Sequence, residues 1–300
     1  MRHWSLRGPM LAIVCGALLV LPVIITVACG SDSTDTTGAA SSATVASSDT
    51  TASPSTEVST ATSAAGDAQE LTVSAASSLK GAFTEIGAAF DQAKNAKTTF
   101  NFDASGTLQK QIEAGAPVDV FASAAPKQIN NLREKRLVDE ASVKNFASNE
   151  IVLVVPTDST LAVTSFEDLT KPEVEKVTYG DPAAAPHGVA AEEILNKLGL
   201  FEQVKPKVIY AANVSQALEY VAKGEVDVGI IFATEAKAGG DKVKIVATSD
   251  PTWHSQIIYP IAIVSASEAK TLGQAFVDFV ISLEGQSILQ DYGFLPAPAQ

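Results

Sequence analysis

Apolar and polar positions follow one repeating order along residues 70–300. Short apolar runs, often β-branched, such as "ELTV" and "PKVIY", lead through a small polar turn into a segment with apolar residues three and four apart. In the first of these segments they are Leu79, Phe83, Ile86 and Phe90. β-Branched runs predict strands, and the longer spacing predicts helices with one buried face. This alternation is typical of an α/β fold with mainly parallel sheets.

The same strand–turn–helix unit is expected four times along the chain. The units are expected at residues 70–90, 98–115, 176–199 and 206–224. Further strands are expected at 117–123, 150–156, 226–232, 243–249 and 257–264, and two helices at 268–284 and 285–293.

The first residues have a different pattern, that of a secretory signal. Arg2 and Arg7 precede the uncharged run "PMLAIVCGALLVLPVIITVACG". The run ends in "TVAC", which resembles the bacterial lipobox, although Thr26 is less usual there than Leu. The resemblance implies a signal peptide over residues 1–28 and a lipid on Cys29. An uncleaved anchor is the alternative, because the run is almost long enough to span a bilayer.

Residues 29–69 are rich in Ser, Thr and Ala and carry no Lys or Arg. Such a stretch buries too little apolar surface to offset its chain entropy, so it is predicted to be a disordered tether. Both cysteines, Cys15 and Cys29, precede the folded body, so that body is expected to hold no disulfide and no cysteine metal site.

The acidic balance of the chain restricts its partners. The formal net charge is −13, and residues 70–300 account for about −10 of it. This balance argues against nucleic acid and against an anionic membrane surface. A small anion remains possible, because helix termini and backbone amides act at short range.

Four of the predicted strand-to-helix turns carry hydroxyl, amide or glycine residues. They are Ser77/Ser78, Ser105/Gly106, His187/Gly188 and Asn213. Ligands of open α/β sheets bind at the carboxyl ends of the strands, where helix N-termini present free N–H groups. Converging turns would form an anion site without a cationic side chain. For any single turn, the alternative is an ordinary N-cap.

Ser77 and Lys80 also spell S-x-x-K, the nucleophile motif of penicillin-binding proteins and serine β-lactamases. The S-D-N-like and K-T-G-like partner motifs of those enzymes are missing from the sequence. His187 and His254 are the only histidines after residue 69, and neither accompanies a G-x-S-x-G elbow or a zinc-ligand spacing. The sequence therefore favours a binding protein with no cofactor and no direct protein–metal ligands, and leaves a serine hydrolase as a distant alternative.

Five segments together carry a family resemblance: "LTVSAASSLKGAFTEIGAAF", "FDASGTLQKQIEAGAPVDVFASA", "YGDPAAAPHGVAAEEILNKLGL", "VGIIFATEA" and "YGFLPAP". In this order they resemble the extracytoplasmic molybdate-binding proteins of ABC transporters. The resemblance implies a type II periplasmic-binding-protein fold, with two α/β lobes that close over the ligand. The lobes are then expected at 70–149 plus 262–300 and at 150–261, with crossover strands in "EIVLVVP" and "YPIAIV".

The resemblance also implies how the oxyanion is held. The family's two serines fall on Ser78 and Ser105, and its two backbone amides fall on His187 and Val214. The family's tyrosine falls on Phe232, which cannot donate a hydrogen bond. The His187 ring and Thr234 are candidate substitute donors, and the favoured interpretation is that His187 contributes only its backbone N–H.

Molybdate or tungstate suits a site made only of donors, since both are fully deprotonated at neutral pH. Phosphate carries a proton, which Asp103 could accept, so phosphate is the first alternative ligand and sulfate the second. The implied partners are an ABC permease and ATPase, with the protein monomeric and lipid-anchored outside the cytoplasmic membrane. A signalling or adhesion lipoprotein with this fold is a further alternative.

Overall fold

The computed structural model describes residues 68–298. The expected signal peptide, Cys29 and almost all of the expected tether lie outside the described residues. The first strand begins at Gln69, one residue before the predicted start of the folded body.

The first five-stranded sheet, with its helices, is called lobe one here. Its strands are β1 (Gln69–Ala76), β2 (Ala96–Asp103), β3 (Val120–Ala122), β4 (Lys144–Ser148) and β10 (Ile258–Ile263). Its helices are α1 (Lys80–Lys94), α2 (Ser105–Glu113), α3 (Pro126–Glu134), α8 (Lys270–Ile281) and α9 (Leu283–Asp291), with 3₁₀ turns η1 (Ser77–Leu79) and η2 (Glu140–Ser142). The strand order is β2-β1-β3-β10-β4; β1 is parallel to β2 and β3, and β10 is antiparallel to β3 and β4.

The second five-stranded sheet, with its helices, is called lobe two. Its strands are β5 (Ile151–Pro156), β6 (Val177–Gly180), β7 (Val208–Ala211), β8 (Val228–Phe232) and β9 (Val243–Thr248). Its helices are α4 (Pro186–Lys197), α5 (Phe201–Val204), α6 (Val214–Ala222) and α7 (Ala233–Gly239), with 3₁₀ turns η3 (Glu167–Thr170), η4 (Lys205–Lys207) and η5 (Gly240–Lys242). The strand order is β7-β6-β8-β5-β9. Strand β6 is parallel to β7 and β8, and β5 is antiparallel to β8 and β9.

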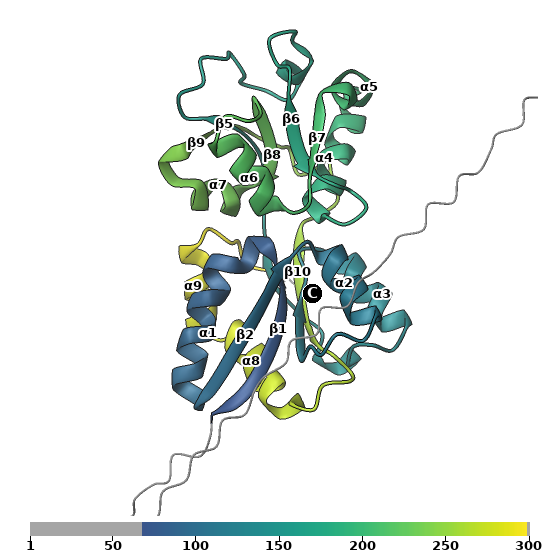
Figure 1. Cartoon of the computed structure of the whole chain (residues 1–300), viewed down its shortest axis with the longest axis vertical. Helices are drawn as coiled ribbons and strands as arrows, with labels where there is room; N and C mark the ends of the chain where they lie inside the picture. The colour runs from purple at the N-terminus through teal and green to yellow at the C-terminus, as the bar shows by residue number, and fades with distance from the viewer. Residues whose placement is uncertain (1–67, 299–300) are drawn as a thin grey trace, which may run out of the picture. The chain divides into compact units, whose positions relative to one another are not determined.

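Helices cover both faces of each sheet (Figure 1). In lobe one, α1, α8 and α9 pack on one face and α2 and α3 on the other; in lobe two, α6 and α7 lie opposite α4 and α5. The apolar positions predicted for α1 are indeed its buried face, since Phe83, Ile86 and Phe90 are fully buried. The two-lobe α/β fold expected from the sequence is the one observed.

The chain crosses between the lobes twice. It leaves β4 for β5 through residues 149–150 and returns from β9 to β10 through residues 249–257. The runs "EIVLVVP" and "YPIAIV" therefore lie almost wholly inside the sheets that follow each crossing. The exact lobe boundaries expected at 149/150 and 261/262 stay predictions, and β10 pairs with the sheet of lobe one from Ile258 onward.

Four helices or strands in the described range were not expected from the pattern: α3, β4, α5 and α7. Helix α3 had a readable signal, because Pro126 opens it and Ile129 and Leu132 are spaced three apart on its buried face. Strand β4 and helix α7 are short, and their sequences "KNFAS" and "ATEAKAG" carry little periodicity. In residues 68–298 none of the helices combines the length and apolarity that crossing a bilayer requires.

Candidate functional site

A small cavity between the lobes brings together the residues singled out in the sequence. It is lined by Ala76, Ser77, Ser78, Asp103, Ala104, Ser105, Ala124, Ala185, Pro186, His187, Val214 and Phe232. Three strands end at the cavity, because Ala76, Asp103 and Phe232, the last residues of β1, β2 and β8, are among its lining residues. No lysine or arginine is among these lining residues, so an anion here would be held by dipoles and hydrogen-bond donors.

Lobe one contributes two serine hydroxyls. Strands β1 and β2 are adjacent and parallel, and their last residues, Ala76 and Asp103, are register partners, which places Ser78 and Ser105 side by side. Both serines are buried. Ser105 Oγ accepts a hydrogen bond from the backbone N–H of Ala124 at 3.0 Å, so its own proton is free to be donated into the cavity.

The hydroxyl of Ser78 has a buried neighbour that the sequence did not reveal. Ser78 Oγ lies 3.0 Å from the phenolic oxygen of Tyr259 on β10. Burial raises the pKa of the Tyr259 phenol well above its usual range, so the phenol keeps its proton at neutral pH. The only signal at this position was an apolar run interpreted as a crossover strand.

Lobe two contributes helix N-termini in place of side chains. His187 and Val214 occupy the first turns of α4 and α6, and no hydrogen bond to the backbone N–H of either is formed within residues 68–298. Asn213 caps α6 by accepting from the N–H of Gln216, which leaves the Val214 amide free. Both free amides belong to cavity-lining residues.

The ring of His187 is buried and neutral. Burial lowers its pKa to about 3 from an ordinary value of 6.5. Its Nε2 atom has no hydrogen-bond partner in the described chain, and its ring lies 5.6 Å from the ring of Phe232, centroid to centroid. On the side of lobe two, Phe232 is therefore an apolar wall against which the His187 ring packs.

Thr234, the other expected substitute donor, does not line this cavity. Its Oγ1 accepts a hydrogen bond from Asn149 Nδ2 at 2.8 Å, next to the crossing between β4 and β5. Phe232 lines the cavity, as expected for the position of the family's tyrosine, and it brings no hydroxyl.

Two hydrogen bonds join the lobes at the rim of the cavity. The Gly106 backbone N–H donates to the Ala184 carbonyl at 2.8 Å, and Asn213 Nδ2 donates to Asp103 Oδ1 at 3.2 Å. Asp103, the residue expected to accept the proton of phosphate, therefore takes part in the contact between lobes. Its Oδ1 also accepts from the N–H of Ala104. A Cβ on Gly106 would lie 2.6 Å from the Ala184 oxygen, so this contact requires glycine.

Beside the cavity, a second concavity contains Lys80 and Glu235 and shares Ser77 and Ser78 with it. Burial raises the pKa of Glu235 to about 7, opposed by a hydrogen bond from Ser215 and by the charge of Lys80. The Lys80 backbone N–H donates to the Ser77 carbonyl, but no hydrogen bond joins their side chains within the described residues, and Lys80 is exposed. The geometry does not support the serine nucleophile and lysine base of a hydrolase.

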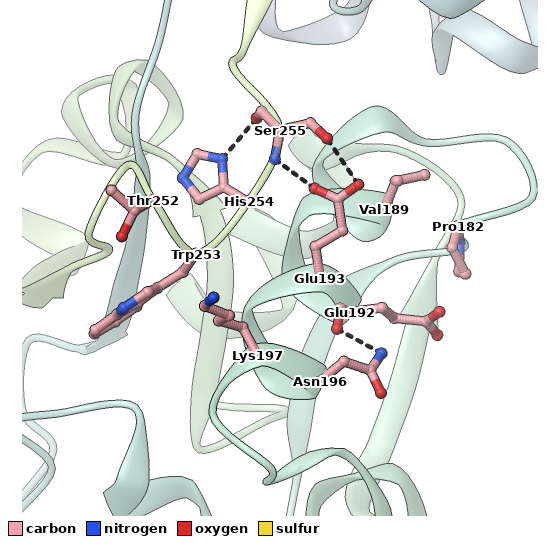
Figure 2. Close-up of a pocket in the computed structure, with 10 residues that line it drawn as sticks. All are labelled: Pro182, Val189, Glu192, Glu193, Asn196, Lys197, Thr252, Trp253, His254 and Ser255. Carbon is pink, nitrogen blue, oxygen red and sulfur yellow. Dashed lines mark hydrogen bonds between the residues drawn. The ribbon is translucent and has the colours of Figure 1, made fainter.

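Figure 2 shows a third concavity, formed by α4 and the second crossing segment. There the backbone N–H and the hydroxyl of Ser255 donate to the carboxylate of Glu193 at 2.6 and 3.0 Å. The carboxylate therefore attaches the crossing segment to α4. In the described part of the chain, no three His, Cys, Asp or Glu side chains gather as metal ligands would.

The comparisons with known proteins agree with one another on the family. Residues 71–295 match the model for a bacterial extracellular solute-binding protein. YvgL of Bacillus subtilis, named provisionally as an ABC transporter substrate-binding lipoprotein, is 37% identical over 225 residues, which are 75% of this chain and 85% of YvgL. The molybdate-binding protein ModA of Escherichia coli is 33% identical over 235 residues, covering 77% of this chain and 91% of ModA.

A solved structure agrees with these relatives. It is the substrate-binding domain of a provisionally named molybdenum ABC transporter from Clostridium difficile. Its TM-score is 0.61 at 36% identity, with 77% of this chain and all of that chain covered.

Proposed function

Because the chain belongs to the family of bacterial extracellular solute-binding proteins, we propose that it captures molybdate or tungstate for an ABC importer. The observation that carries the proposal is the composition of the cavity. Two serine hydroxyls from lobe one and two helix-start amides from lobe two belong to residues that line it, and no cationic side chain lines it. A fully deprotonated tetrahedral dianion matches a site made mainly of donors.

The proposed contacts are the hydroxyls of Ser78 and Ser105 and the backbone amides of His187 and Val214. Phe232 provides an apolar wall where the family's tyrosine would donate. The His187 ring contributes shape, because it is neutral and packs against Phe232. The metal arrives inside the oxyanion, so the protein needs no metal ligands of its own.

The thermal unfolding midpoint of the purified full-length protein tests this proposal. It is measured with excess molybdate, tungstate, sulfate and phosphate in turn. A ligand at 100 times its dissociation constant should stabilise the fold by about 2.7 kcal/mol. Molybdate and tungstate should raise the midpoint most. A rise with phosphate alone would overturn the ligand, and no rise with any oxyanion would favour a signalling or adhesion role.

We also propose that the protein acts outside the cytoplasmic membrane as a monomer, anchored by a lipid on Cys29 and delivering its ligand to a permease and ATPase. The leader ending in "TVAC" and the name of the Bacillus subtilis relative support this placement. The mass of the protein extracted from membranes tests this: the loss of residues 1–28 together with an added lipid mass on Cys29 is expected. The mass of the intact chain would support an uncleaved anchor instead.

A further inference from the structure

Three buried polar residues form a chain of hydrogen bonds behind the cavity. Asn149 Nδ2 lies 3.1 Å from the Tyr259 hydroxyl, and that hydroxyl lies 3.0 Å from Ser78 Oγ. Tyr259 is fully buried, and both other residues are at most 8% exposed. Since water does not reach these groups freely, their hydrogen bonds must be satisfied by one another.

The direction of the chain begins at Asn149. Its Oδ1 accepts from the backbone N–H of Glu150 at 2.9 Å, which determines which end of the amide is oxygen. Its Nδ2 therefore points the other way and donates to two oxygens, those of Tyr259 and Thr234. Asn149 is a donor to Tyr259 and cannot accept from it.

The same reasoning continues at Tyr259. Its oxygen accepts from Asn149, so its own proton needs an acceptor. Ser78 Oγ is the one acceptor within hydrogen-bond distance in the described chain. If Ser78 donated instead, the buried Tyr259 proton would be left unsatisfied, which is costly. Tyr259 therefore donates to Ser78, and the Ser78 proton is left to point into the cavity.

The position of the Tyr259 ring supports this role. The ring packs against Phe146, Phe232 and Phe294, with centroids 6.2, 5.9 and 5.3 Å away. Four residues earlier, Ser255 is held to α4 by Glu193 (Figure 2). The ring is thus enclosed, and its hydroxyl has a defined position.

We propose that Tyr259 is a positioning residue that commits the Ser78 hydroxyl to donation and so makes the site discriminate against oxyanions that carry a proton. The inference rests on the proposed function. Ser105 is committed in the same way by the Ala124 amide. A protonated anion such as hydrogen phosphate would bring a donor to two hydroxyls that are already donors, so its proton would have to be accepted elsewhere, and Asp103 is the one carboxylate among the lining residues.

The first test is Tyr259→Phe, which removes the hydroxyl and keeps the ring. Molybdate affinity, measured by titration calorimetry at pH 7.5, should fall about tenfold, the loss of roughly one hydrogen bond. Phosphate affinity should fall less, because the Ser78 hydroxyl, no longer oriented by Tyr259, can turn either its proton or its lone pairs toward the ligand, so the ratio of the two affinities should drop. Tyr210→Phe is the matched control: its hydroxyl meets Glu192 at the surface of lobe two, and both affinities should stay unchanged.

The second test is a double-mutant cycle with Ser78→Ala. If Tyr259 acts through Ser78, Tyr259→Phe should change molybdate affinity less than twofold in the Ser78→Ala protein. Full additivity of the two losses would overturn the proposal. If Tyr259→Phe does not fold, Asn149→Ala replaces it in the cycle, with the same non-additivity expected at a few-fold loss.

The wild-type titrations separate the two proposals. If the wild type binds molybdate but Tyr259→Phe keeps both its affinity and its selectivity, positioning by Tyr259 is wrong and the proposed function stands. If the wild type binds sulfate in place of molybdate, only the ligand is wrong, and the cycle is run with sulfate. If it binds no oxyanion, both proposals fall.

Discussion

The two halves of the cavity are built on different principles. Lobe one presents two side-chain hydroxyls, each held by a protein hydrogen bond from behind. Lobe two presents backbone amides at the starts of α4 and α6 and the apolar ring of Phe232, against which His187 packs. Contacts from lobe one are therefore encoded by particular side chains, whereas those from lobe two depend on where two helices begin. The same substitution should have unequal effects on the two sides.

The difference between the two lobes is tested most directly by shortening one side chain in each of them. Ser105→Ala removes a donor and should weaken molybdate binding about 10- to 100-fold, the range expected for one hydrogen bond to a charged group. Val214→Ala keeps its backbone N–H and should change affinity by less than about threefold on the same reasoning. Titration calorimetry of both variants measures the contrast, and equal losses would contradict it.

The contact between the lobes is the next target. Gly106→Ala places a Cβ 2.6 Å from the oxygen and 2.8 Å from the Cα of Ala184, both backbone atoms. Crowding of this kind costs about 1–3 kcal/mol, so molybdate affinity should fall about 5- to 100-fold. Gly273→Ala, in α8, is the control, because its Cβ would meet only side-chain atoms at 3.3 Å or more. Similar affinities for the two variants would show that the lobes close without this contact.

A hydroxyl can also be added to lobe two. Phe232→Tyr supplies the donor that the family's tyrosine provides and should tighten molybdate binding about tenfold. Phe201→Tyr, a substitution away from the cavity in the same lobe, should leave the affinity unchanged. If Phe232→Tyr has no effect, lobe two already supplies a substitute donor, and the His187 ring becomes the candidate.

The smallest expected effect concerns stability and the neutral ring of His187. Its pKa is lowered by burial to about 3 in the folded protein against an ordinary 6.5. As the pH falls below 6.5, His187 binds a proton in the unfolded chain but stays neutral in the folded protein. The contribution of His187 to stability should thus fall by about 1.4 kcal/mol at pH 5.5 relative to pH 7.5, while Glu235, whose pKa is raised to about 7, changes stability in the opposite direction over this range.

Urea unfolding at the two pH values measures this loss. The His187→Gln protein cannot take up that proton in either state and keeps Glu235, so from pH 7.5 to pH 5.5 the wild type should lose about 1.4 kcal/mol relative to this variant. Parallel changes in both proteins would show that His187 is protonated, and hence hydrated, in the folded protein.

Local patterns in the sequence were sufficient for most of the fold. The four strand–turn–helix units were expected from apolar spacing, because a parallel strand and its helix must each bury one predictable set of positions. The short elements β4 and α7 were missed, since a few residues with weak periodicity become ordered only through the neighbours they pack against.

The sequence by itself determined which residues are available to hold an anion: Ser78, Ser105 and the glycine-, histidine- and asparagine-containing turns, each at a strand end. Only the tertiary structure decided which of them meet. It excluded Thr234 from the cavity, used Asp103 and Gly106 to join the lobes, and placed Tyr259 behind Ser78 although 181 residues separate them. The physical reason is that helix starts are local properties of the chain, whereas the direction of a hydroxyl proton depends on buried partners that arrive from elsewhere in the sequence.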